Sequence, residues 1–171
     1  MLLWLYLLSL PLMACQPYSD SYYSHLPDAE HRSATCQKGV SIGMLYGLDP
    51  EMVAALLMEE QRHADKDYEG GIRGPFQVSA KDWCEGGTFS TCADLNIAGA
   101  RAISLLRNCS KINWSNYECK RERRKPLPWS KVLCHYASGN KCTKKGLAYT
   151  KRVMRWRNNV RRYSRLRLAR R

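Results

Sequence analysis

The chain has 171 residues, a length that suits one globular domain with short appendages rather than several domains. Hydrophobic residues make up 44% and charged residues 25%, which is typical of a folded protein and argues against intrinsic disorder. The net charge of +13 is unevenly distributed: residues 123–171 contain 17 Lys or Arg and no acid, whereas residues 1–122 contain 11 basic and 15 acidic side chains. The final third should therefore attract polyanions, although charge alone does not specify which ones.

The first residues predict export. Residues 1–14 are apolar and uncharged, but the run is shorter than the roughly 20 residues that span a bilayer. A short apolar run that ends in small residues is typical of a signal segment, so we expect the periplasm, the cell envelope or secretion. The sequence Leu12-Met13-Ala14-Cys15 also resembles a bacterial lipobox. A lipid anchor on Cys15 and an unmodified cysteine both remain open.

Eight cysteines agree with an oxidising compartment. Six of them form close sequence pairs that could each close a short surface loop, at positions 84/92, 109/119 and 134/142. The remaining two, Cys15 and Cys36, leave the full connectivity open. No CxxC pair occurs, which argues against a structural zinc site.

In the first half of the chain, a tether at residues 15–36 should precede a helix at about 40–46 that Gly47 ends. Asp49-Pro50-Glu51 then supplies a cap, a proline at the first helical position and an acid in the first turn. These signals predict a helix whose core residues include Met52 and Leu56. The Gly-rich residues 62–74 predict a loop, one helical turn follows at 79–83, and 84–92 should form a disulfide-closed loop.

The second half of the chain predicts three more helices. The first covers about 94–107, the second starts near Pro128 and stops at Gly139, and the third runs from Gly146 into a basic tail at 158–171. Residues 108–128 are expected to be irregular, since no alternating strand pattern of any length is found. The sequence therefore predicts an all-α fold, or one with minimal β-structure, with a single disulfide-braced domain at 37–157.

Two segments of the chain stand out, YGLDPEMVAALLMEEQ at residues 46–61 and GPFQV at residues 74–78. The first resembles the catalytic helix of the superfamily of soluble lytic transglycosylases and goose-type lysozymes, and the second resembles its Gly-Leu-Met-Gln-Val segment. Residues 96–99, NIAG, are a looser match to a helix start. Residues 136–140, YASGN, are similar to its Tyr-Asn-Ala-Gly segment, and Tyr149 with Val153 fits a later helix. The sequence departs from the pattern at Pro75-Phe76 and at Ala137.

The resemblance implies a lysozyme-like fold and a monomeric, cofactor-free lyase. Its substrate would be the β-1,4 bond between N-acetylmuramic acid and N-acetylglucosamine in peptidoglycan, and its products would carry 1,6-anhydromuramoyl ends. Carried over by position, the resemblance implies Glu60 as the catalytic acid and four substrate-binding residues, namely Gly74, Gln77, Tyr136 and Tyr149.

The chemistry gives an independent reason to select a glutamate at the end of this helix. A general acid must keep its proton near neutral pH, and burial of a carboxyl group beside apolar residues raises its pKa. Counting from Pro50 selects Glu60, whereas counting back from Gln77 selects Glu59. We favour Glu60, because a deletion in a helix turns the side chain by about 100° while loops tolerate deletions.

Two alternative functions remain open. A hydrolase of the goose-type lysozyme class would need a second carboxylate to activate water, for which Asp65, Asp67 and Glu69 are candidates without diagnostic spacing. A non-catalytic cationic protein that binds the cell envelope would need no acid at all. The predicted export and the acidic N-terminal part argue against nucleic acid as the partner.

The C-terminal helix offers an apolar stripe of Val153, Trp156, Val160 and Tyr163 among many arginines. Such a basic amphipathic segment can hold a protein on an anionic envelope surface. The alternative is a solvated last helix with a frayed end.

Overall fold

The computed structural model describes residues 14–16, 29–61, 72–73, 75–79, 94–114, 116, 118–139 and 141–169. This part of the chain is mostly helical, as the sequence predicts. The helices are α2 (Ala29–Leu45), α3 (Pro50–Gln61), α5 (Leu95–Asn108), α6 (Trp129–Ser138) and α7 (Lys144–Leu168). Two small antiparallel sheets accompany them, one of β1 (Ile72–Arg73) with β2 (Val78–Ser79) and one of β3 (Cys109–Asn113) with β4 (Glu118–Glu122).

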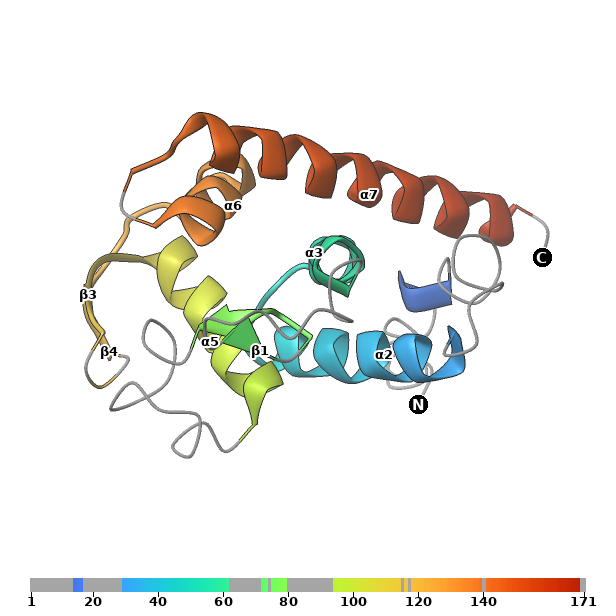
Figure 1. Cartoon of the computed structure of the whole chain (residues 1–171), viewed down its shortest axis with the longest axis horizontal. Helices are drawn as coiled ribbons and strands as arrows, with labels where there is room; N and C mark the ends of the chain where they lie inside the picture. Colours follow the sequence, from blue (N-terminus) through green and yellow to red (C-terminus); the bar gives the residue numbers. More distant parts are fainter. Residues whose placement is uncertain are drawn as a thin grey trace.

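Helix α3 forms the centre of the fold. Figure 1 views it nearly end-on, between α2 on one side and α7 on the other. The Asp49 carboxylate accepts from the backbone N–H of Glu51 at 3.0 Å, so the predicted cap is present. Every residue from Met52 to Glu59 is buried. A helix that is apolar on all sides is typical of a core, because it has no face to present to water.

Helix α2 is longer than the sequence predicts and starts at Ala29, so residues 29–36 belong to this helix rather than to a tether. Glycines let it approach α3 closely: a Cβ at Gly39 would lie 2.7 Å from Leu57 Cδ1, and one at Gly43 would lie 2.8 Å from Val53 Cγ2. The short helix expected at about 40–46 is therefore part of a longer helix, whose contacts with α3 also include Gly39 and Arg32.

Three disulfides are present among the described residues. Cys109–Cys119 and Cys134–Cys142 confirm two of the predicted close pairs, while residues 84 and 92 lie outside the described residues. Cys15, in a helical turn at residues 14–16, is bonded to Cys36 on α2. A lipid anchor would require the same Cys15 sulfur, which this disulfide occupies.

The β3–β4 hairpin occupies most of the segment expected to be irregular at 108–128, and residues 123–128 are irregular as predicted. Its strands pair from Cys109 with Glu122 to Asn113 with Glu118, with register shifts near Lys111. Every residue of β4 is exposed, so the hairpin lacks the alternation of buried and exposed residues that would reveal it in sequence. The Cys109–Cys119 disulfide links the two strands covalently.

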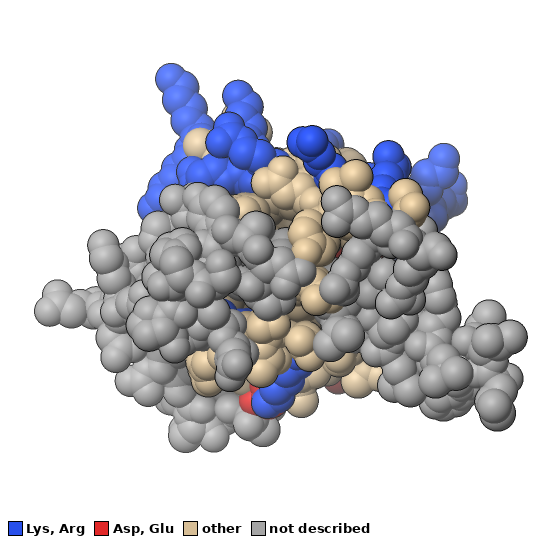
Figure 2. Space-filling model, turned by 90° about the vertical axis from the view of Figure 1, so that its right-hand side faces the viewer, with Lys and Arg blue, Asp and Glu red and all other residues tan. Residues whose placement is uncertain are grey.

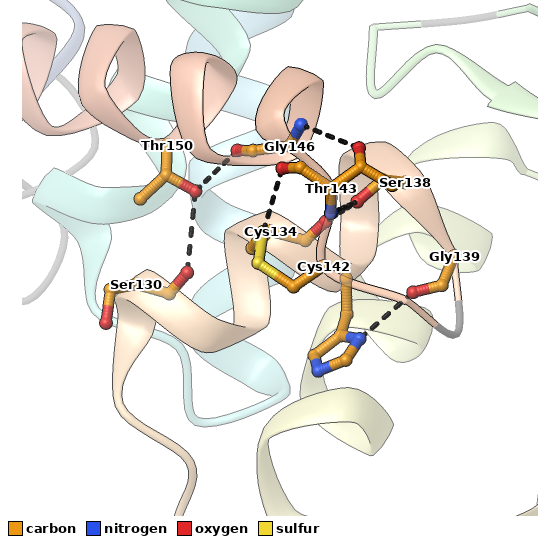
Figure 3. The surroundings of a disulfide bond; sticks show 9 residues. Ser130, Cys134, Ser138, Gly139, Cys142, Thr143, Gly146 and Thr150 are labelled. Carbon is orange, nitrogen blue, oxygen red and sulfur yellow. Dashed lines mark hydrogen bonds between the residues drawn. A yellow bond between two sulfur atoms is a disulfide. The ribbon is translucent and has the colours of Figure 1, made fainter.

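The turn between α6 and α7 brings the two helices into close contact (Figure 3). Within it, Ser138 Oγ donates to the carbonyl of Cys134 at 2.6 Å, and the N–H of Gly146 donates to Thr143 Oγ1 at 3.3 Å. A Cβ at Gly146 would lie 2.7 Å from the Cys134 carbonyl oxygen, so only glycine fits this contact. The Cys134–Cys142 disulfide closes the same turn.

Helix α7 runs without interruption to Leu168, so residues 158–168 of the expected basic tail continue the helix. Val153 and Val160 are completely buried in the core, which means that the tail is packed on the domain rather than appended to it. Within the described residues, no helix is long and apolar enough to cross a membrane. Of the predicted signal at residues 1–14, the structure describes only Ala14, which is buried in the helical turn at residues 14–16.

Candidate functional site

The Glu60 carboxyl group lies where α3 ends and faces α7. The Tyr149 hydroxyl donates a hydrogen bond to Glu60 Oε1. Burial raises the pKa of Glu60 from its ordinary value of 4.5 to about 7. The hydrogen bond from Tyr149 opposes this rise, the neighbouring Glu59 adds to it, and Arg152 opposes it. A carboxyl group with this pKa is protonated in a large fraction of molecules at neutral pH.

The adjacent Glu59 has a different environment. Its side chain is buried, and it accepts a hydrogen bond from Arg152 Nε in a salt bridge. The indole N–H of Trp156 donates to the other carboxylate oxygen at 3.2 Å. The carboxylate of Glu59 is thus engaged by a cation and by a second hydrogen-bond donor. Glu59 therefore contributes a structural ion pair, which favours Glu60 over Glu59 as the proton donor.

Two tyrosines stand beside Glu60. Tyr149 comes from α7 and Tyr136 from α6, and their ring centroids are 6.4 Å apart. Burial raises the pKa of each hydroxyl well above 10, and the proximity of Glu60 adds to the rise. Both hydroxyls therefore keep their protons and act as hydrogen-bond donors near neutral pH.

The turn between β1 and β2 is connected to the same cluster. The Tyr136 hydroxyl donates to the carbonyl of Phe76, a residue of that turn. Phe76 is fully buried against Gly99 of α5, where a Cβ would lie only 2.5 Å from its side chain. This contact explains why α5 needs a glycine at position 99, in its first turns.

Gln77 has a left-handed backbone with φ of +48°, a conformation that costs a non-glycine residue about 1 kcal/mol or more. Its side chain is partly buried. The conformation is held between Phe76, anchored to Tyr136 and Gly99, and the buried Val78. Such a strained residue is frequent at functional sites, because the surrounding structure must enforce it.

The structure thus brings Glu60, Tyr149 and Tyr136 together and links the turn of Gln77 to them through Phe76. The predicted binding residue Gly74 lies outside the described residues, as do Asp65, Asp67 and Glu69. Sequence reasoning missed the contribution of Arg152 and Trp156. The signal that was available is their helical spacing from Tyr149, which places all three on neighbouring turns of one helix.

Among the described residues, no group of three or more His, Cys, Asp or Glu side chains is placed to hold a metal ion. Comparison of the chain with protein-family models, with curated proteins and with solved structures finds no match. The chemistry open to the site therefore has to be inferred from its geometry. The site offers one protonated carboxyl group, a phenolic donor to that carboxyl and a second tyrosine close by.

Proposed function

We propose that this chain is a peptidoglycan lytic transglycosylase with a lysozyme-like domain, and that Glu60 is its catalytic acid. The observation that carries the proposal is the environment of Glu60, whose pKa is raised to about 7 by burial. The family-like motifs also support it, because Tyr149 and Tyr136 lie beside this carboxyl group and Tyr136 bonds to Phe76 of the GPFQV segment. The central position of α3, in contact with both α2 and α7, is compatible with the same proposal.

In the proposed reaction, the protonated Glu60 gives its proton to the glycosidic oxygen that links muramic acid to the next sugar. The bond from the anomeric carbon to that oxygen breaks, and positive charge develops on the sugar ring. The Glu60 carboxylate then takes the proton from the 6-hydroxyl of the same muramic acid, whose oxygen bonds to the anomeric carbon. Glu60 is protonated again, no water is consumed, and the product carries a 1,6-anhydro ring.

The Tyr149 hydroxyl supports both halves of this cycle. After the first proton transfer Glu60 is a carboxylate, and the hydrogen bond from Tyr149 stabilises that charged form. The bond limits how far burial raises the pKa of Glu60. A carboxyl group whose pKa remains near the working pH can both release and recover a proton, and a residue that acts first as the acid and then as the base must do both.

The decisive experiment is digestion of purified peptidoglycan sacculi, followed by mass spectrometry of the released muropeptides. We expect anhydromuramoyl ends from the wild type and a loss of roughly 100- to 10,000-fold in the rate for Glu60→Gln, the usual contribution of a general acid. Glu51→Gln is a matched control, since it makes the same change on the same helix away from the site.

The possible outcomes separate the remaining hypotheses. Reducing muramoyl ends would indicate hydrolysis by a goose-type lysozyme mechanism in place of the lyase reaction. Loss of activity in Glu59→Gln with an active Glu60→Gln would transfer the acid role to Glu59. Binding of sacculi without release of any muropeptide would support a non-catalytic envelope-binding protein.

A further inference from the structure

The outward face of α7 carries a continuous line of positive charge. Lys144, Lys151, Arg155 and Arg162 are all exposed. At 100° per residue their directions fall within about 40° of one another, and the first and last are about 27 Å apart along the helix. We call these four side chains the outer ridge.

Among the described residues, no acid pairs with the outer ridge. Helix α7 contains no acidic residue, and three of its other arginines pair with acids of the α3 region. These inward pairs are Arg152–Glu59, Arg157–Asp49 and Arg161–Glu51. Within the part of the chain that the structure describes, no ion pair involves a residue of the outer ridge. Figure 2 shows Lys and Arg gathered at the top of the molecule, where Figure 1 places α7.

Two exposed leucines lie beside the ridge near the ends of the helix. Leu147 is 51% exposed and Leu166 is 52% exposed, and both point within about 60° of the ridge direction. The apolar stripe that the sequence suggested for surface binding is used elsewhere. Val153 and Val160 are buried in the core, and Trp156 donates to Glu59. Among the side chains of α7 that the structure describes, the large apolar ones exposed to a partner are therefore Leu147 and Leu166.

We infer that the outer ridge, with Leu147 and Leu166, docks α7 on the surface of an anionic phospholipid membrane. A straight line of cations on a rigid helix fits a flat array of phosphate groups, and an interfacial helix also buries apolar side chains at the acyl boundary. Nucleic acid offers the phosphates but no apolar layer for the leucines. The inference is independent of the chemistry proposed for Glu60. In the docked orientation Tyr149, on the opposite side of α7, faces away from the membrane.

The test uses the full chain and vesicles of about one quarter phosphatidylglycerol in phosphatidylcholine, with pure phosphatidylcholine vesicles as the uncharged probe. The triple variant Lys151→Gln/Arg155→Gln/Arg162→Gln should bind the anionic vesicles about 100-fold more weakly, because each basic residue near such a surface contributes roughly five-fold. The control Lys111→Gln/Lys120→Gln/Lys125→Gln makes the same charge change at exposed positions outside α7 and should bind almost as the wild type does.

A second variant distinguishes lipid from other polyanions. Leu147→Ser/Leu166→Ser should weaken binding to anionic vesicles several-fold while leaving binding to a DNA duplex unchanged. Circular dichroism confirms that each variant is folded. Equal losses in the ridge variant and the control variant would overturn the inference, as would absence of vesicle binding by the wild type. If the ridge variant lost binding to DNA but bound vesicles as the wild type does, the outer ridge would be a nucleic-acid surface instead.

Discussion

The two ends of the α3 region differ in how their acids are compensated. At the N-terminal end, Asp49 is bonded to Arg157 at 2.6 Å and Glu51 to Arg161. At the C-terminal end, Glu59 has Arg152, whereas Glu60 has a tyrosine hydroxyl and, among the described residues, no salt bridge. Acids are also favoured at a helix N-terminus and disfavoured at its C-terminus by the helix dipole. One acid of the four is therefore left to retain a proton.

This comparison teaches that α7 neutralises the acids that serve the fold and leaves unneutralised the one proposed to serve chemistry. The three acids that form salt bridges stabilise the fold, and the fourth, Glu60, is the one proposed for catalysis. Substitution of each acid or of its partner on α7 tests this difference, and we expect the largest effect at Glu60.

Glu60→Gln should stabilise the protein in a pH-dependent way. Below about pH 4.5 the carboxyl group is protonated in both folded and unfolded chains, so the variant should change little. As the pH rises to about 7 the unfolded chain loses this proton first, which costs native stability on the order of 3 kcal/mol by pH 8.5. Glutamine removes that cost. Urea denaturation of variant and wild type near pH 4.5 and at pH 8.5 measures this cost. Equal stability of the two proteins at pH 8.5 would contradict the raised pKa of Glu60.

Arg152→Met should destabilise the fold by about 2–4 kcal/mol, because it leaves the buried Glu59 carboxylate without its cation. Glu59→Gln should cost only about 1 kcal/mol, since the 45% exposed Arg152 can return to water. The double variant should recover part of the loss of Arg152→Met. Chemical denaturation measures the free energy of unfolding of the three variants. Equal losses in the two single variants would contradict the expectation that the buried Glu59 depends on its partner more than Arg152 does.

Tyr149→Phe should cost about 1–2 kcal/mol, because a buried carboxyl group loses its donor. The lost bond stabilised the charged form of Glu60, so the pKa of Glu60 should rise further and the alkaline limb of the pH–activity profile should move to higher pH. Tyr46→Phe is the matched control, as its hydroxyl forms no hydrogen bond among the described residues. A profile that moves to lower pH would contradict this role for Tyr149.

Arg161→Ala should have the smallest effect, about 0.5 kcal/mol, because both members of its pair with Glu51 are partly exposed to water. The effect should disappear at high salt, where exposed charges are screened. Thermal unfolding at low and high ionic strength measures it. A loss of stability as large as that of Arg152→Met would contradict the claim that the exposed pair at one end of α3 contributes less than the buried pair at the other.

Much of the fold was predictable because its signals are local. The start of α3 at Asp49-Pro50, the cap of α5 at Asp94 and the end of α6 at Gly139 each depend on a few neighbouring residues. The β3–β4 hairpin was missed because its exposed strands have no pattern to detect. The early start of α2 was missed because residues 29–39 show no clear apolar periodicity.

The candidate site was predictable only in part. The order of motifs selected Glu60, Tyr136 and Tyr149, and the structure brings these three together. The different environments of Glu59 and Glu60 could not be predicted, because the partners of Glu59 are 93 and 97 residues distant in the sequence. Which glutamate meets an arginine depends on how α3 and α7 cross, and that is a property of tertiary packing.

The charge of α7 has a consequence for the order of folding. Its 25 residues include lysines in the first turn and no acid anywhere, so the cations of a nascent helix in this segment repel one another and those of its first turn oppose the helix dipole. It becomes favourable only when the acids and apolar side chains of the α3 region are already in place to receive it. The segment should therefore join the native structure late, after α2 and α3 have assembled, and the completion of the Glu60 environment should wait for it.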